Sequence, residues 1–288
     1  MQNPVPFHHW LRLLRSPSPA ACPPSPAPSF APPPDAPVSL WAQTALGFSP
    51  DPLQARILDS PSSRLILLCC RQFGKSTLAA LKALHFALSH PNSTILCVSP
   101  TLRRSTEWLR LVRHFFSILS THGPQPPLTP APSAPLSRAT SVSLTLPNAS
   151  RILALPGAAS SNRGYTAHLL LFEEAAFIPD PVFAALTPSL AATDGALWLI
   201  SSAGAPSGFF YEIWSNPGHP FTRFSATAGQ CPRISPHHLI EARLALGELR
   251  FRREYLCHFT TGEPSLFSPE ILESALDDSF DPWTLEAA

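Results

Sequence analysis

Gly74, Lys75, Ser76 and Thr77 are residues whose types and order can bind phosphate. Between a strand and a helix, backbone N–H groups and such a lysine hold the phosphates of a nucleotide, and the serine hydroxyl ligates Mg²⁺. The stretch therefore predicts a nucleotide site, provided that a strand precedes it and a helix follows it.

The residues that lead to Gly74 depart from the usual pattern. The sequence from residue 70 is "CRQFGKST", and Cys69, just before it, occupies the place of the glycine that normally stands five residues before Gly74. A working nucleotide site, a variant that belongs to one family and a chance match at a helix start are all open at this point. Arg71 could contact phosphate or form a salt bridge at the edge of the loop.

Two consecutive acids follow the apolar run "HLLLF" at residues 168–172. In nucleotide hydrolases, an acid at a strand end holds the water shell of the metal ion, and an adjacent acid polarises the attacking water. Glu173 is the candidate for the first role and Glu174 for the second. The alternative is an exposed pair of acids at a strand end.

Three further polar residues are candidates for nucleotide contacts. Ser201 and Ser202 end the run "ALWLISS", and their hydroxyls would lie near the γ phosphate, where they could sense hydrolysis. The alternative for them is a capped strand end. Gln54, in "GFSPDPLQARIL" at 47–58, has a side-chain amide that can pair with the edge of adenine, and it could equally be a surface glutamine.

The hydrophobic pattern predicts the elements that would position these residues. Apolar runs are typical of buried strands, whereas apolar residues at helical spacing predict helices. A hairpin is expected around the turn residues Pro147 and Asn148. The alternation of buried strands and helices predicts an α/β fold with a central, mostly parallel sheet flanked by helices. The expected strands are 64–70, 93–100, 168–177 and 196–204, the helices are 75–90 and 105–120, and the hairpin strands are 141–146 and 150–157.

Composition limits which parts of the chain can fold and which partners its charge favours. The chain has 288 residues, of which 36 are proline, and its net charge of +1 gives no whole-chain argument for or against binding nucleic acid. Residues 1–40 are rich in Pro, Ser and Ala and are expected to be disordered, and the proline cluster at 122–137 is expected to be a surface loop. The arginine-rich stretch 242–256 could contact DNA phosphates, although its pattern favours a solvated helix face.

The cysteines and histidines suggest neither a disulfide framework nor a zinc site, because their spacing fits neither. No apolar run is long enough for a membrane span. A soluble, cytoplasmic protein without membrane attachment is therefore expected. Arg163 and Gly164, in "NRGYT", could belong to a loop that faces DNA or nucleotide, or to an ordinary surface loop.

Taken in order, these pieces resemble the ATPase (motor) domain of the tailed-phage terminase large subunit family. That family tolerates Arg-Gln-x-Gly-Lys-Ser/Thr without the first glycine, which would make Cys69 a family variant. The resemblance covers roughly residues 45–267 and is carried by "CRQFGKST", "ILCVSPTLRRSTEWL", "PNASRILALPG", "NRGYTAHLLLFEEAAFIPD", "LISSAGAPSGFFYEIW" and "FRREYLCHF".

The resemblance implies a P-loop NTPase fold of the RecA/terminase-like type over residues 41–267, followed by a tail at 268–288. It implies Mg²⁺-dependent ATP hydrolysis as a DNA-packaging motor encoded by a phage or prophage and acting in the bacterial host cytoplasm. The implied partners are double-stranded DNA, a portal and other copies of the chain in a ring, and a small terminase subunit is left open. The implied site residues are Lys75, Glu174 and Arg71 for catalysis, Ser76 and Glu173 for Mg²⁺, and Gln54, Cys70, Arg71, Gln72, Phe73, Gly74, Lys75, Ser76, Thr77, Ser201 and Ser202 for ATP.

Three departures from the family leave alternatives open. Glu173 stands where the family usually has Asp, and Arg104 where it often has Gln. The family also carries a second domain, a nuclease of ribonuclease-H type, whereas this chain ends at Ala288. The acids at 277, 278 and 281 are expected to be a solvated tail, so nuclease activity is not expected. A kinase, a helicase-like ATPase and a catalytically degenerate prophage remnant that binds DNA or a partner remain as rival functions.

Overall fold

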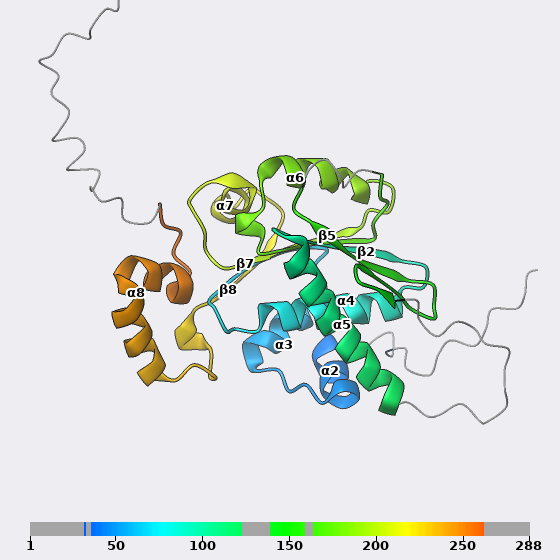
Figure 1. The fold of residues 1–288 in the computed structure, drawn as a ribbon, viewed down its shortest axis with the longest axis horizontal. Coiled ribbons are helices and arrows are strands. Elements are labelled where there is room, and N and C mark those ends of the chain that lie inside the picture. Colours follow the sequence, from blue (N-terminus) through cyan, green and yellow to red (C-terminus); the bar gives the residue numbers. More distant parts are fainter. Residues whose placement is uncertain (1–31, 33–35, 123–138, 159–163, 262–288) are drawn as a thin grey trace, which may run out of the picture.

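The central feature of the computed structural model is one sheet of eight strands in the order β3-β4-β5-β2-β6-β7-β1-β8 (Figure 1). The structure describes residues 32, 36–122, 139–158 and 164–261. The six strands from β5 to β8 in this order are parallel to their neighbours, and β3 and β4 add an antiparallel edge. The strands are β1 (Arg64–Cys69), β2 (Thr94–Ser99), β3 (Ala139–Thr140), β4 (Ser143–Thr145), β5 (Arg151–Pro156), β6 (Leu169–Glu173), β7 (Ala196–Ser201) and β8 (Thr222–Ala226).

Helices cover both faces of this sheet. In Figure 1, α2 to α5 lie on one side of the sheet and α6 and α7 on the other, while α8 lies beyond the β8 edge. The helices are α2 (Val38–Leu46), α3 (Pro52–Leu58), α4 (Lys75–Ser89), α5 (Leu102–His122), α6 (Asp180–Leu186), α7 (Gly208–Ser215) and α8 (Pro236–Leu256), with short 3₁₀ turns η2 (Ala175–Phe177), η3 (Thr187–Leu190) and η4 (Ala228–Gln230). Within the described residues, no helix is long and apolar enough to cross a membrane.

The central strands form because they can be buried on both faces. Every residue of β6 is buried, and so is each residue of β1, β2 and β7 after the first. Strands in such a position are continuously apolar instead of alternating, since no face meets water. The predicted α/β fold, its four central strands, its two predicted helices and the hairpin that pairs β4 with β5 are confirmed.

Two strands and several helices were not predicted from the sequence. Strand β3 has two exposed residues, and β8 is mostly exposed or half-buried, so neither has an apolar run that would reveal it. Both lie at the edges of the sheet, where short and polar strands are usual. The expectation of disorder is wrong for residues 38–40, which begin α2, a helix held by the burial of Trp41, Ala42 and Leu46. Most of segment 1–37, the proline cluster at 122–137 and the tail from residue 268 lie outside the described residues, so these expectations stay predictions.

Parallel pairing brings the carboxyl ends of four strands to one edge of the sheet. Leu68 of β1 lies opposite Ser201 of β7, and Glu173 of β6 lies opposite Ile200 of β7. Strand β2, which ends at Ser99, pairs with the other side of β6. Ligands of open α/β sheets bind at this kind of edge, because the loops after several strands converge there.

Lys82 joins two helices on the side of the sheet that carries the glycine-containing loop. Its ammonium group on α4 donates hydrogen bonds to the carbonyl oxygens of Leu58 (2.7 Å) and Ser60 (2.6 Å), at the end of α3. It also lies 5.1 Å from the ring centre of Trp198. Burial lowers the pKa of Lys82 to about 8, although the nearby Asp59 acts in the opposite direction. The charged ammonium group of Lys82 is therefore less favourable in the folded protein than in water, and this lowers the free energy of unfolding.

This cost predicts a pH-dependent stability. In the unfolded chain the lysine has a pKa of about 10.4, so between about pH 8 and 10 the unfolded state binds more protons than the folded one. The free energy of unfolding should therefore rise with pH through this window, by up to about 3 kcal/mol from this group. In urea unfolding, the difference between wild type and Lys82→Met should show this rise, because subtraction removes other titrating groups. Arg56→Met, at an exposed position of α3, is the control and should give a flat difference. If the difference in unfolding free energy between wild type and Lys82→Met did not change with pH, the lowered pKa of Lys82 would be contradicted.

Candidate nucleotide-binding site

The loop between β1 and α4 has two sharp turns, and neither falls at Cys69. Gln72 (φ 64°) and Gly74 (φ 91°) have left-handed backbone conformations. Cys69 is the last residue of β1 and is completely buried. A strand position accepts any L-residue, whereas a left-handed one favours glycine. The absent glycine therefore leaves the shape of this loop intact, which is the physical reason that the departure is tolerated.

Helix α4 begins without a side-chain cap. Its N-cap is Gly74, which has no side chain to accept from the N–H groups of the first turn. These N–H groups and the partial positive charge of the helix start favour an anion. Because Lys75, Ser76 and Thr77 form that first turn and line the adjoining cleft, the helix start can hold phosphate oxygens.

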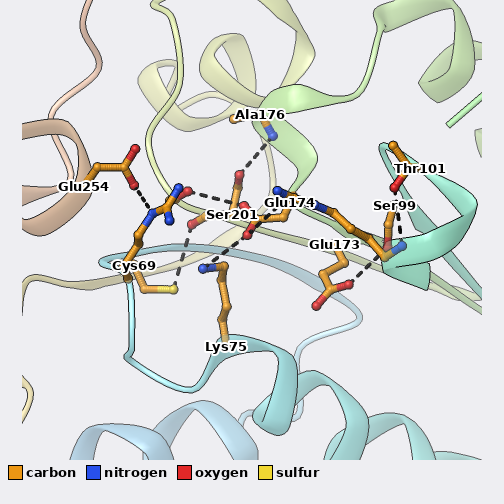
Figure 2. Close-up of polar contacts among 12 residues, drawn as sticks. Cys69, Lys75, Ser99, Thr101, Glu173, Glu174, Ala176, Ser201 and Glu254 are labelled. Atoms are coloured by element: carbon orange, nitrogen blue, oxygen red, sulfur yellow. Dashed lines mark hydrogen bonds and ion pairs between the residues drawn. The ribbon is translucent and has the colours of Figure 1, made fainter. Parts of the chain in front are cut away.

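Lys75 and Glu174 meet across the carboxyl edge of the sheet. Their charged atoms Nζ and Oε1 are 3.3 Å apart, and their side chains are only 12% and 17% exposed. Figure 2 shows Lys75 extending from the start of α4 toward Glu174. Burial opposes the charged form of the lysine, but Glu174 and its acidic neighbours outweigh it, and the pKa of Lys75 lies above its usual range. The lysine is thus charged and ready for an anionic ligand.

Glu173 is in a different environment from its neighbour. It is 5% exposed, and it accepts hydrogen bonds from the hydroxyls of Ser99 (3.1 Å) and Ser76. Burial raises the pKa of Glu173, and these hydroxyl bonds only partly counter it. Glu174 has a left-handed conformation (φ 55°), which turns the chain at the end of β6 and directs the two carboxylates differently. Figure 2 shows Glu173 pointing away from Glu174.

The two serines at the end of β7 hold the turn that carries these acids. Ser201 Oγ accepts a hydrogen bond from the backbone N–H of Ala176 (3.1 Å). Ser202 Oγ donates to Glu174 Oε2 (3.3 Å). Both hydroxyls therefore contact the turn at residues 174–176, Ser201 at the backbone of Ala176 and Ser202 at the side chain of Glu174. These contacts link the end of β7 to the position of Glu174.

Two arginines approach the same place from other elements. Arg104, in the first turns of α5, lies with Nη1 3.8 Å from Glu174 Oε1 and is about half exposed. Arg71, in the loop, donates through Nε to Glu254 of α8 (2.5 Å), and its own side chain is 64% exposed. Both guanidinium groups are therefore accessible cations at the rim of the site.

These residues surround a cleft of about 1180 Å³, larger than the roughly 300–1,000 Å³ of ordinary ligand pockets. Most of the predicted site residues line it, and four do not. Cys70 and Phe73 belong to the loop but are completely buried, Ser201 is buried under the acid turn, and Gln54 is buried against the loop. The predicted residues that line the cleft are Arg71, Gln72, Gly74, Lys75, Ser76, Thr77, Glu173, Glu174 and Ser202.

Sequence reasoning missed several residues that contact the site. Ser99 could have been found, since it is a polar residue at the end of an apolar strand. Glu254 and Arg233 had no signal, because they lie far along the chain from the residues they contact, Arg71 and Phe73. Gly164 is described and does not line the cleft, whereas Arg163 is outside the described residues.

The contrast between the two acids predicts opposite effects of the same substitution. Glu173→Gln removes a charge that burial destabilises, so metal-free protein at pH 8 should gain about 2–4 °C in Tm. The gain should shrink as pH falls and be lost below about pH 4, where Glu173 becomes protonated in both the folded and the unfolded chain. Glu174→Gln leaves Lys75 buried without its carboxylate and should lower Tm. Thermal unfolding of both variants in EDTA gives the comparison. A lower Tm in Glu173→Gln at pH 8 would contradict the stated environment of Glu173.

Comparison with known proteins agrees with this geometry. The family described as "Terminase large subunit, T4likevirus-type, N-terminal" matches residues 66–274. The large terminase subunit of Thermus phage G20c is 27% identical over 262 residues, and that of Thermus virus P23-45 is 28% identical over 258 residues. Each alignment covers 77% of this chain and 51% of the relative. The chain thus spans about half the length of these relatives.

Solved structures share the fold. A point mutant of the large terminase ATPase domain of Thermus phage P74-26 gives a TM-score of 0.65 at 22% identity, covering 78% of this chain and 99% of that domain. The large terminase of bacteriophage HK97 gives 0.59 at 16% identity, covering 77% of this chain and 54% of that protein. The predicted P-loop NTPase fold is therefore confirmed. The family match extends over more than half of this chain. The chain therefore belongs to the terminase large subunit family and contains the N-terminal ATPase region of such a subunit.

Proposed function

We propose that this chain hydrolyses ATP with Mg²⁺ and serves as the motor domain of a phage DNA-packaging machine. The observation that carries the proposal is the contact between Lys75 at the start of α4 and Glu174 at the end of β6. It unites a phosphate-binding loop with a carboxylate able to orient water, within one cleft. Solved structures of the large terminase from a thermophilic bacteriophage contain ATP-γ-S or ADP, which supports a nucleotide as the ligand.

Phosphate binding falls to the loop and the helix start. The N–H groups of the first turn of α4 and the ammonium group of Lys75 bind the β and γ phosphates. The phosphates compete with Glu174 for Lys75, since the lysine pairs with that carboxylate in the structure. Nucleotide binding therefore frees Glu174 from its cation.

Ser76 and Glu173 fit a magnesium ion. The carboxylate of Glu173 is buried among hydroxyls, and no described basic side chain forms an ion pair with it. Mg²⁺ in nucleotide sites uses one or two protein oxygens and completes its shell with water and phosphate. The ion would neutralise phosphate charge during hydrolysis. The longer side chain of Glu173, compared with aspartate, reaches Ser76 directly.

Glu174 and Arg71 are the proposed catalytic residues. Glu174 accepts a proton from, and orients, the water that attacks the γ phosphate. Ser202 and Arg104 hold its carboxylate from two sides. Arg71 is proposed to stabilise charge on the γ phosphate, for which it must leave Glu254. Ser201 and Ser202 are proposed to transmit the change at Glu174 to β7.

The wider role of the motor rests on family membership. Relatives of this chain are named as large terminase subunits of phages. We propose double-stranded DNA as the substrate of translocation, a ring of copies on a portal as the assembly, a small subunit as a further partner and the host cytoplasm as the place of action. We propose that the ATPase region has boundaries near residues 41 and 267.

The test is a set of substitutions measured for both binding and turnover. Lys75→Ala should abolish binding of a non-hydrolysable ATP analogue in titration calorimetry, because it removes the cation that reaches the β and γ phosphates. Glu174→Gln should bind normally and hydrolyse at least about 100-fold more slowly, a loss of some 2.7 kcal/mol of transition-state stabilisation. Glu212→Gln, at an exposed position of α7, is the matched control and should behave as wild type.

The outcomes separate the rival functions. A wild type that neither binds nor hydrolyses ATP, with or without duplex DNA, would favour the catalytically degenerate remnant. Transfer of phosphate to a small molecule in place of water would favour a kinase, and strand separation would favour a helicase-like ATPase. Glu173→Asp should keep or raise the activity if the longer acid is a poor fit, whereas a rate loss of about 100-fold or more would show that the site is built around the longer acid. Inactive wild type restored by this substitution would again favour the remnant.

Nuclease activity is not part of the proposed function of this chain. Among the described residues, no group of three or more His, Cys, Asp or Glu side chains could hold a metal ion. Two-metal nucleases require carboxylates that place two ions about 3.5–4 Å apart. We expect supercoiled plasmid to remain intact with the purified chain and Mn²⁺. Nicking that persists in a double variant of Glu173 and Glu174 to alanine would reveal a nuclease site.

A further inference from the structure

The carbonyl oxygen of Phe73, next to Gly74 in the loop, accepts two side-chain hydrogen bonds. Arg233 donates to it through Nη2 (2.8 Å), and Gln54 donates through Nε2 (2.8 Å). Gln54 comes from α3, whereas Arg233 lies in the segment between η4 and α8. A point at the centre of the phosphate loop is thus held by residues from two distant parts of the chain.

Fixing this carbonyl also fixes the N–H group that follows it. In a trans peptide, the C=O of one residue and the N–H of the next point in opposite directions. With the Phe73 carbonyl directed at Gln54 and Arg233, the N–H of Gly74 points away from them. Gly74 lines the cleft and Gln54 does not. The hydrogen bonds therefore present this N–H on the side where a phosphate would bind.

The loop needs such support because its backbone is strained. Gln72 has a left-handed backbone conformation without being glycine, and such a conformation is unfavourable unless its surroundings impose it. The thiol of Cys231 lies 3.9 Å from the carbonyl oxygen of Gln72. Segment 231–233 thus contacts two successive carbonyls of the loop. A Cβ atom on Gly74 would lie 3.2 Å from Gln54 Nε2, so Gln54 also limits the space behind the loop.

Asp51 completes the cluster and leaves the amide of Gln54 little capacity for another ligand. Asp51 Oδ2 pairs with Arg233 Nη1 (3.0 Å), and Oδ1 accepts from the backbone N–H of Gln54 (2.9 Å). Gln54 Oε1 accepts from the backbone N–H of Asp51 (3.1 Å) and from Arg233 (3.3 Å). Gln54 is 2% exposed. Its oxygen has two donors and one of its N–H groups is used, so an adenine edge would have to displace existing bonds.

We propose that Asp51, Gln54 and Arg233 form a loop clamp that positions the phosphate loop, with Arg233 as a positioning residue for nucleotide binding. The inference rests on the proposed function and extends it, because no role in that function falls to Arg233. It also assigns the amide of Gln54 to the loop in place of the base. The clamp positions the loop that binds phosphates and does not contact the base. Its loss should therefore weaken the binding of adenine and guanine nucleotides to the same extent.

The experiment compares Arg233→Ala, Gln54→Ala and the double variant by titration calorimetry. The ligands are ADP and non-hydrolysable analogues of ATP and GTP. Each single variant should weaken binding of all three ligands about tenfold, or about 1.4 kcal/mol, because each removes a hydrogen bond that involves the charged guanidinium group. The double variant should lose clearly less than the product of the two, because both residues act on one carbonyl. Arg243→Ala, an exposed α8 position paired with Glu248, is the control and should bind as wild type.

Hydrogen exchange without nucleotide gives a second readout. Peptides covering residues 70–77 should exchange faster in Arg233→Ala and Gln54→Ala than in wild type or in the control. Arg233→Lys keeps the charge but cannot bridge Asp51 and Phe73 with a fork, so it should fall between wild type and Arg233→Ala. If Arg233→Ala fails to fold, Arg233→Lys decides by the same two measurements.

Two results would overturn the clamp. One is unchanged affinity and unchanged exchange in the folded Arg233 variants. The other is loss of ATP preference over GTP in Gln54→Ala while Arg233→Ala binds normally, which would assign Gln54 to the base. If wild type binds no nucleotide, the proposed function fails, and the exchange measurement alone then supports or overturns the clamp.

Discussion

A buried lysine needs a carboxylate within reach, and this requirement organises the site. Lys75 and Glu174 are both largely removed from water, where an unpaired charge would cost several kcal/mol. They can meet only because β1 and β6 end at the same edge of the sheet with β7 between them. The strand order thus has an electrostatic consequence: it places the ammonium group of Lys75 beside the carboxylate of Glu174 in the cleft.

The two adjacent acids show how backbone geometry divides the work between similar side chains. Glu173 ends the strand in regular conformation and remains among hydroxyls, whereas Glu174 turns left-handed and joins the basic side chains. A carboxylate among hydroxyls retains lone pairs for a metal ion, whereas one among cations forms ion pairs with them. Residues with the same side chain therefore acquire different chemistry from a single turn of the chain.

The segment after β8 is connected to the phosphate loop at two places. Arg233 contacts the carbonyl before Gly74, and Glu254 of α8 pairs with Arg71. If Arg71 moves toward phosphate as proposed, it must break its contact with Glu254, which would link nucleotide binding energetically to the position of α8. Reciprocity follows from thermodynamics: a partner that shifts α8 would change nucleotide affinity. In the proposed motor, this link would let a change at the phosphate loop reach a surface element.

The sequence by itself determined the elements whose residues signal their own environment. Short continuous apolar runs are typical of strands buried on both faces, and polar residues that follow such strands lie at the sheet edge. The loop, the acid pair and Ser202 were found in this way, and the family pattern followed from their order. The short edge strands had no such signal, because they bury too little.

Tertiary structure alone decided which side chains those residues meet. Gln54 has the composition of a base-reading residue, yet packing directs its amide to the Phe73 carbonyl. Glu173 and Glu174 are alike in sequence, and only the turn between them separates their environments. Arg233 and Glu254 contact the loop from far along the chain, at separations of 160 and 183 residues. Contacts of this kind depend on the path of the whole chain through space, which no local pattern of residue types records.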